Sequence, residues 1–199
     1  LNSEDNLEGG RSVTAGFDYN LRNLNDEINF SLGQVINEKN NKNMPASSSL
    51  DKRFSDVVGS LTYKNNKNFE INYNYSLDQN YQDLNYNELG AKLQTNNIKF
   101  DFNYLQEKKH IGDQEYLKTN IELTRGENAI FSAGTKRSLV TNSAEYYNLS
   151  YEYLNDCLRA GLVFRREFYN DSELEPENSL LFKITLTPFG NVNSPSFNK

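Results

Sequence analysis

The chain has 199 residues and a formal net charge of −6, so it lacks the basic face that a nucleic-acid-binding protein needs. Only 36% of its residues are hydrophobic, and no stretch approaches the ~20 consecutive apolar residues of a membrane-spanning helix. One Cys and one His exclude an internal disulfide framework and leave little for a metal site, whereas 13 Tyr and 12 Phe are too many for a disordered acidic chain.

Aromatic and aliphatic residues alternate with polar residues along the chain. In the first run, Val13, Phe17 and Leu21 share one parity and therefore one face of a strand. The pattern predicts an all-β fold with about eleven strands and no helix, the runs being 13–21, 28–36, 57–63, 69–77, 84–93, 98–104, 117–123, 129–139, 147–153, 158–168 and 180–186. A parity change in the fifth run predicts a β-bulge near Asn87–Glu88, and the run 129–139 is ambiguous in face.

The opposite faces of these runs are polar. Runs of about ten alternating residues are typical of tilted strands that cross a bilayer, with apolar sides toward lipid and polar sides toward a wet interior. A soluble two-sheet sandwich is the alternative, in which the apolar faces pack on one another. The charges predicted to face the interior are Lys99, Asp101, Lys118, Glu122, Arg159, Arg165, Glu167 and Lys183. Because the two signs are interleaved, a mixed face that is solvated or contacts a plug is favoured over a surface that binds lipid phosphates.

The connections between the runs alternate between short and long. The long ones include 37–54 and 170–178, and the tight ones include 95–97 and 155–156. Outer-membrane barrels have short periplasmic turns and longer outside loops. The alternation therefore places the short turns in the periplasm, and the Met-Pro-Ala and Ser segment near Met44 is expected to be a flexible outside loop.

The number of predicted strands and the first residues of the chain together predict that the sequence is a fragment of a larger protein. Single-chain bacterial barrels have even strand numbers, whereas this chain shows eleven runs, no initiator Met and no signal peptide. We expect residues 1–190 to form the carboxyl-terminal part of a larger antiparallel barrel, and residues 191–199 to form a periplasmic tail.

The stretch from Tyr151 to Gly190 resembles a known family. It reads YEYLNDCLRAGLVFRREFYNDSELEPENSLLFKITLTPFG. A Cys at a tight turn, a strand that runs into Arg-Arg, an acidic loop and a strand that closes in Leu-Thr-Pro-Phe-Gly are similar to the end of LptD, the lipopolysaccharide-assembly protein of the outer membrane. The residues upstream match only as alternating strands.

The resemblance implies a barrel of about 26 strands in the outer membrane of a Gram-negative bacterium. An LptE-like lipoprotein would plug it, and an LptA-like periplasmic bridge would deliver lipopolysaccharide through an amino-terminal domain absent from this sequence. The lipid would leave sideways between the first and last strands. The sequence shows no metal-ligand spacing and no phosphate-binding glycine loop, so we expect no metal, no cofactor and no catalysis.

Cys157 lies beside a turn expected in the oxidising periplasm, where disulfides persist, and its parity is opposite to that of Leu158 and Ala160. A buried free thiol is the alternative to a distant partner. By resemblance, that partner lies in the missing amino-terminal domain.

The last predicted strand is the candidate lateral gate. Pro188 has no N–H to give to a strand ladder, so pairing with the first strand is weakened there. The candidate gate residues are Leu180, Phe182, Ile184, Leu186 and Pro188.

The sequence therefore predicts part of a translocon that inserts lipopolysaccharide into the outer leaflet. A passive porin-like channel, a barrel enzyme and a soluble all-β binding module are the alternatives. His110 and Asp113 fall on one outside loop and are expected to be solvated, because no supporting catalytic cluster accompanies them.

Overall fold

The computed structural model describes residues 10–65, 68–109, 112–168, 177–186, 190–193 and 197–198. In this part of the chain the secondary structure is almost entirely strand, with one short 3-10 helix, η2 (Ala46–Ser48). Across the described residues, no helix is long and apolar enough to span a membrane.

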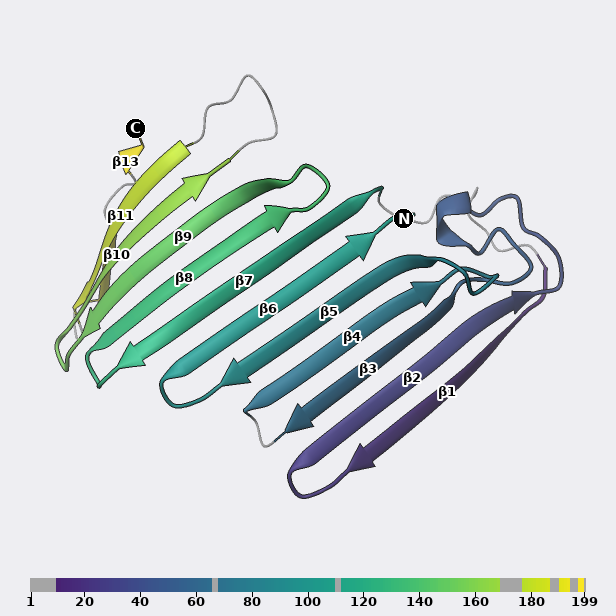
Figure 1. Cartoon of the computed structure of the whole chain (residues 1–199), viewed down its shortest axis with the longest axis horizontal. Helices are drawn as coiled ribbons and strands as arrows, with labels where there is room; N and C mark the ends of the chain where they lie inside the picture. The colour runs from purple at the N-terminus through teal and green to yellow at the C-terminus, as the bar shows by residue number, and fades with distance from the viewer. Residues whose placement is uncertain are drawn as a thin grey trace. The chain divides into compact units, whose positions relative to one another are not determined.

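Eleven long strands occupy the described part of the chain, as the alternation predicts (Figure 1). They are β1 (Ser12–Arg22), β2 (Asp26–Asn37), β3 (Val57–Asn65), β4 (Phe69–Leu77), β5 (Leu84–Gln94), β6 (Ile98–Glu107), β7 (Gln114–Arg125), β8 (Ala129–Ser138), β9 (Ser143–Leu154), β10 (Leu158–Glu167) and β11 (Glu177–Leu186). Two short strands follow, β12 (Gly190–Asn193) and β13 (Phe197–Asn198), and both pair with β11. They fall at the end of the chain, around the segment expected to be a tail.

The strands form one antiparallel meander. Their order in the sheet is their order in the sequence from β1 to β12. This confirms the predicted all-β, antiparallel class. The chain divides into two compact units, Leu1–Gly90 with Tyr104–Glu115, and Ala91–Asn103 with Tyr116–Lys199.

In the first unit, the register aligns apolar side chains in rows across four strands. Tyr19 lies opposite Phe30, which lies opposite Leu61, which lies opposite Tyr73. In the next row Phe17 lies opposite Leu32, which lies opposite Gly59, which lies opposite Tyr75. The Tyr75 ring occupies the space that a side chain larger than that of Gly59 would fill. Because side chains alternate along each strand, the residues between these rows all face the other side.

In the second unit, the same arrangement continues from β7 to β11. Leu123, Phe131, Tyr151, Leu162 and Phe182 are successive cross-strand partners. The register thus resolves most of the ambiguous run 129–139, because Phe131, Ala133 and Thr135 lie opposite Tyr151, Leu149 and Tyr147 and share their face.

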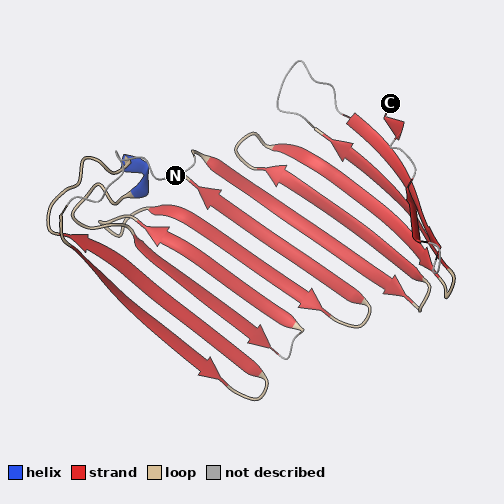
Figure 2. Cartoon of the chain, turned by 180° about the vertical axis from the view of Figure 1, so that it is seen from behind, coloured by secondary structure: helices blue, strands red, loops and turns tan. Residues whose placement is uncertain are grey.

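The apolar face has no second layer over it. Among the described residues, Val57 is the only hydrophobic side chain classed as buried, and Leu149, Phe17 and Leu162 are 55%, 56% and 45% exposed. In Figures 1 and 2 the strands of each unit lie in a single layer. The sandwich alternative is therefore wrong, since its apolar faces would have to cover one another.

The connections alternate as predicted. The short ones are 23–25, 66–68, 95–97, 126–128 and 155–157, and the others are 38–56, 78–83, 108–113, 139–142 and 168–176. Because consecutive strands run in opposite directions, the two kinds of connection fall at opposite strand ends.

Candidate functional site

The polar face of the first unit is held together by its own side chains. Ser31 and Ser60 share a hydrogen bond of 2.7 Å between their hydroxyls, and the Asn20 amide donates to the Asn29 side chain. Further along, the Asn74 amide donates to Glu88 Oε2 over 3.0 Å. A polar face that satisfies its own groups can line a wet interior without unpaired donors.

Tyr86 lies on this polar face. Its hydroxyl donates to Glu88 Oε2 over 2.8 Å, and a Cβ placed on Gly90 would meet the Asn72 side chain. Residues 86, 88 and 90 therefore keep one parity, and the predicted shift near Asn87–Glu88 is not seen there. The sequence pattern misleads at Tyr86 because a tyrosine ring whose hydroxyl has a partner is stable on either face.

On the polar face of the second unit, several predicted interior charges form ion pairs. Lys99 Nζ lies 2.7 Å from Glu122 Oε1, and the Arg159 guanidinium lies 2.5 Å from Glu152 Oε2. Arg165 Nε lies 2.5 Å from Glu167 Oε1. These side chains are half-exposed, so each pair contributes only about 0–1 kcal/mol. The pairing fits the mixed, solvated face that the interleaved signs predict.

The other predicted interior charges sit in register with this face. Lys118 lies opposite Lys136 of β8, which in turn pairs with Glu145 at 2.7 Å. Lys183 lies opposite Gly161, and Asp101 has the parity of Lys99 in β6. Two cations facing each other across a strand pair make this stretch locally positive.

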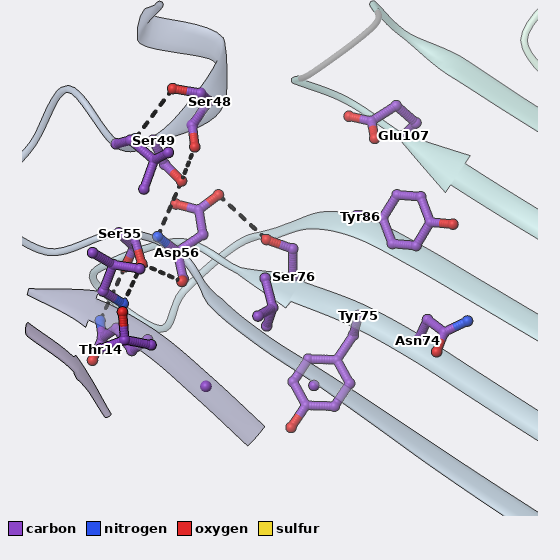
Figure 3. Close-up of a pocket in the computed structure, with 16 residues that line it drawn as sticks. Thr14, Ser48, Ser49, Ser55, Asp56, Asn74, Tyr75, Ser76, Tyr86 and Glu107 are labelled. Carbon is purple, nitrogen blue, oxygen red and sulfur yellow. Dashed lines mark hydrogen bonds between the residues drawn. The ribbon is translucent and has the colours of Figure 1, made fainter. Parts of the chain in front are cut away.

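A cavity of about 600 Å³ lies at the long-connection end of the first unit (Figure 3). Most of the strand residues in its floor belong to the polar side of the strands, and its roof is the connection between β2 and β3, which contributes Ser48 to Leu50. The remaining lining residues are Thr14, Gly33, Gln34, Val35, Ser55, Asp56, Val58, Gly59, Asn74, Tyr75, Ser76, Tyr86 and Glu107.

The roof of this cavity is packed, although its composition predicts a flexible loop. Ser49, Ser55 and Asp56 are only 3%, 5% and 4% exposed. The Asn37 amide of β2 donates to the carbonyls of Leu50 and Lys52 over 3.1 and 2.8 Å. These bonds satisfy backbone groups that a buried loop would otherwise leave unpaired.

Asp56 is the most connected group of the site. Its carboxylate accepts a hydrogen bond of 2.6 Å from the Asn85 amide and one of 3.4 Å from the Ser76 hydroxyl, and it lies 3.4 Å from Lys109 Nζ. The Lys109 backbone N–H donates to the buried Glu107 carboxylate over 2.8 Å. Three chain segments distant in sequence thus meet at one carboxylate.

Sequence reasoning missed this cluster. Asp56, Ser76, Asn85 and Lys109 lie outside the alternating centres of the strands and match no motif. The one feature of the sequence that could have indicated the cluster is the position of its residues. All four lie near the longer connections, which the alternation of lengths assigns to the same end of the strands.

Cys157 is exposed and lies in the short turn 155–157. The Asn155 side chain accepts the backbone N–H of Cys157 over 3.0 Å and that of Leu158 over 2.7 Å, which fixes the turn. The exposure rules out the buried-thiol interpretation, and the disulfide partner stays a prediction.

The candidate gate residues Leu180, Phe182, Ile184 and Leu186 share one face of β11. Pro188 and His110 lie outside the described residues, so their roles stay predictions. Asp113 is exposed in the connection 108–113, and among the described residues no cluster of His, Cys, Asp and Glu could hold a metal ion.

In the link between β4 and β5, Asp78 organises the turn. The backbone N–H of Gln82 donates to its Oδ1 over 2.8 Å and that of Asp83 over 3.2 Å. The hydrogen bond from Gln82, followed by that from Asp83, holds the pKa of the Asp78 carboxyl below its usual value, because both favour the charged form.

A one-layer antiparallel meander with a bare apolar face, a self-bonded polar face and alternating connection lengths is the architecture of an outer-membrane β-barrel protein. The comparison with protein families identifies the family within this class. The family LptD: LPS transport system D matches residues 1–156, and the chain belongs to this family. No curated protein matches the chain.

The family predicted from residues 151–190 is confirmed, although the match lies elsewhere. It covers the upstream strands and overlaps the resembling stretch only at residues 151–156. The protein is therefore an outer-membrane protein of a transport and assembly family, with a role in lipopolysaccharide transport at the family level.

Proposed function

We propose that this chain forms part of the wall of a translocon that inserts lipopolysaccharide into the outer leaflet through a lateral opening of the barrel. The observation that carries the proposal is the two-faced sheet of a chain in the LptD family. An amphipathic lipid can pass such a wall at an open seam, with its sugars and phosphates on the polar side and its acyl chains in the membrane.

In this proposal the lateral opening lies at the edge of β11 that faces away from β10. On one side, β11 pairs with β10 over ten successive residue pairs, from Leu158 with Leu186 to Glu167 with Glu177. On the other side, its described pairs are four with β12 and two with β13. Among the residues that the structure describes, the longer ladder of β11 is thus the one with β10.

The proposal includes two protein partners and one disulfide within the protein. An LptE-like lipoprotein would plug the polar interior, and an LptA-like bridge would deliver the lipid through an amino-terminal domain. Cys157 would couple that domain to the barrel through a disulfide, which its exposure in a short turn permits.

The test is photo-cross-linking at matched heights on two strands. Ile184 of β11 and Tyr153 of β9 flank Ala160 in one cross-strand row, toward the short-turn end. At that depth the surrounding inner leaflet holds phospholipid. In the full-length protein in its own outer membrane, a benzoylphenylalanine at position 184 should capture lipopolysaccharide about tenfold more than one at position 153. Equal capture at both positions would contradict the exit of lipopolysaccharide through a lateral opening at β11.

A passive channel is the second candidate, because the connection between β2 and β3 folds over the polar face as a constriction loop does. Steady ion conductance of the purified protein, without lipopolysaccharide capture at position 184, would favour the channel.

A further inference from the structure

We propose that the apolar side of β8 to β10 holds one resident molecule of a phosphorylated glycolipid of the outer leaflet. Its phosphates would lie between Arg137 and Arg166, here called the rim arginines, and one of its acyl chains would lie in an apolar groove beside them. This site goes beyond the proposed function, because it lies on the membrane side of the wall and not on the route of transport.

The groove lies on the apolar side of the second unit and has a volume of about 380 Å³. Ala133 of β8 lies opposite Ile121 on one side and Leu149 on the other, so its small side chain leaves a depression between two larger ones. In the next row toward the short turns, the rings of Phe131 and Tyr151 line the groove, with centroids 4.7 Å apart. An apolar groove on a face that meets lipid fits a segment of an acyl chain.

The strand β8 leads from the groove to the strand end with the longer connections. Beyond Ala133, the next residues of β8 on the same face are Thr135 and Arg137, and the connection 139–142 follows shortly after. In outer-membrane barrels the longer connections face outward, so the outer leaflet surrounds this end. A lipid with an acyl chain in the groove would therefore place its headgroup at the rim arginines.

The two rim arginines lie on the same side of the sheet with one strand, β9, between them (Figure 1). Arg166 of β10 lies opposite Tyr147 of β9. Tyr147 in turn lies opposite Thr135, two residues before Arg137. Two strand spacings amount to about 10 Å, and arginine side chains are long, so both guanidinium groups can reach one headgroup.

Both guanidinium groups are oriented by neighbours that carry no negative charge. Arg137 donates to Asn142 Oδ1 over 2.6 Å, and Arg166 Cζ lies 4.9 Å from the centroid of the Phe168 ring. The Phe168 ring contacts that of Tyr147 edge to face, with centroids 5.7 Å apart. Both arginines are exposed, and these contacts leave N–H donors of each guanidinium for a ligand.

The cations of the polar side have partners of a different kind. There, Lys99, Arg159 and Arg165 each lie within 2.7 Å of a carboxylate oxygen. Within the part of the chain that the structure describes, neither rim arginine forms an ion pair. An anionic partner stabilises a cation on the membrane side, and guanidinium groups bind phosphate through paired hydrogen bonds.

The rim favours a glycolipid over an ordinary phospholipid. Two cations about two strand spacings apart match a headgroup with more than one phosphate, whereas an ordinary phospholipid carries one. Tyr147 is 46% exposed and, with Phe168, presents an aromatic surface on which a sugar ring can lie. Lipopolysaccharide already inserted in the outer leaflet has this chemistry.

The test uses the purified full-length protein with benzoylphenylalanine at position 147, in phosphatidylcholine vesicles that contain a small fraction of one probe lipid. The probes are lipid A with both phosphates, lipid A without phosphates, and phosphatidylglycerol. Photo-cross-linking to phosphorylated lipid A should exceed that to each of the other two probes about tenfold, because only this probe offers two phosphates to the rim arginines.

Two variants separate the headgroup from the acyl chain. Arg137→Gln combined with Arg166→Gln should remove the preference, so that both lipid A probes are captured equally. Ala133→Leu fills the groove and should lower the capture of both lipid A probes about threefold, while the preference for phosphate remains.

Arg125→Gln and Ala129→Leu are the matched controls. Both residues lie in register with each other on the same side of the sheet, at the short-turn end. Neither substitution should change the capture of any probe, because neither residue lies at the rim or in the groove.

Three results would overturn the site. The first is equal capture of the two lipid A probes by the protein with its rim arginines, and the second is an unchanged preference in the double arginine variant. The third is capture of phosphatidylglycerol as efficient as that of phosphorylated lipid A, because the occupant would then be any anionic lipid. Loss of cross-linking to unphosphorylated lipid A in the double variant would also contradict the site, since the arginines would then stabilise the wall itself.

Discussion

Single tyrosines in this protein do not reveal the face on which they lie. Tyr75 covers Gly59 on the apolar side, whereas Tyr86 donates to Glu88 on the polar side. The ring is apolar and the hydroxyl is polar, so the neighbours decide. The role of a glycine also depends on its neighbours. Gly59 leaves room for the Tyr75 ring, and Gly90 leaves room for the Asn72 side chain.

Asp78 gives a pH-dependent prediction for one outer connection. Its folded pKa is lowered, so its contribution to the order of residues 78–83 is present above the unfolded pKa of about 3.9 and is lost as pH falls through the folded value. Asp78→Ala should speed amide exchange in this segment about fivefold at pH 7, and the difference from the wild-type protein should shrink as pH falls through the folded pKa.

Gln79→Ala is the control for Asp78, because it changes the same turn without removing the carboxylate. A pH-independent difference between Asp78→Ala and the wild-type protein would contradict the assigned role. So would equal exchange in all three proteins at pH 7.

At the scale of strands, the register between neighbouring strands aligns their alternating side chains, so that the sheet has one continuous apolar face and one continuous polar face. A shift of one residue between β8 and β9 would set Phe131 opposite Ser150 and expose polar side chains to lipid. The one irregularity in the described registers lies between Lys136 and Arg137, close to the end of β8, where it leaves the central rows intact.

Leu149 and Ser150 give a paired test of the two faces of β9. Leu149→Arg puts a charge on the lipid side near the strand centre and should cost ~2–4 kcal/mol of unfolding free energy. Ser150→Arg puts the same charge on the polar side and should cost under ~1 kcal/mol. Urea titration of the protein refolded in bilayers measures both, and equal costs would mean that the faces are misassigned.

At the scale of the whole molecule, the connection lengths set an orientation in the membrane. The long connection 38–56 and the short turn 126–128 lie at opposite strand ends. In an outer-membrane protein the longer connections face outward and the short turns face the periplasm.

Cysteine labelling of intact cells checks this orientation. In a Cys157→Ser background, Asn41→Cys should react with a membrane-impermeant maleimide, and Glu127→Cys should react at least about tenfold less until the outer membrane is broken. The reverse pattern would invert the proposed topology, including the periplasmic position of Cys157.

Much of the fold could be predicted because alternation is local. Period-2 patterns predict β1 to β11, place Phe17 and Leu162 on the apolar face, and separate short from long connections. The interleaved charges predict a face of mixed sign, and the structure adds that Lys99 and Arg159 form ion pairs on it. Each of the predicted properties depends on residues that are neighbours in sequence.

Other features were settled only in the tertiary structure, because they join residues far apart in the chain. Asp56 meets Lys109 across 53 positions of sequence, and no spacing rule connects them. The side on which Tyr86 lies and the packing of the connection 38–56 likewise depend on which strands and connections come together. The alternation of residue types along the sequence determines the two faces of each strand. Which connections cover these faces is determined only in the folded structure, because it depends on contacts between residues far apart in the chain.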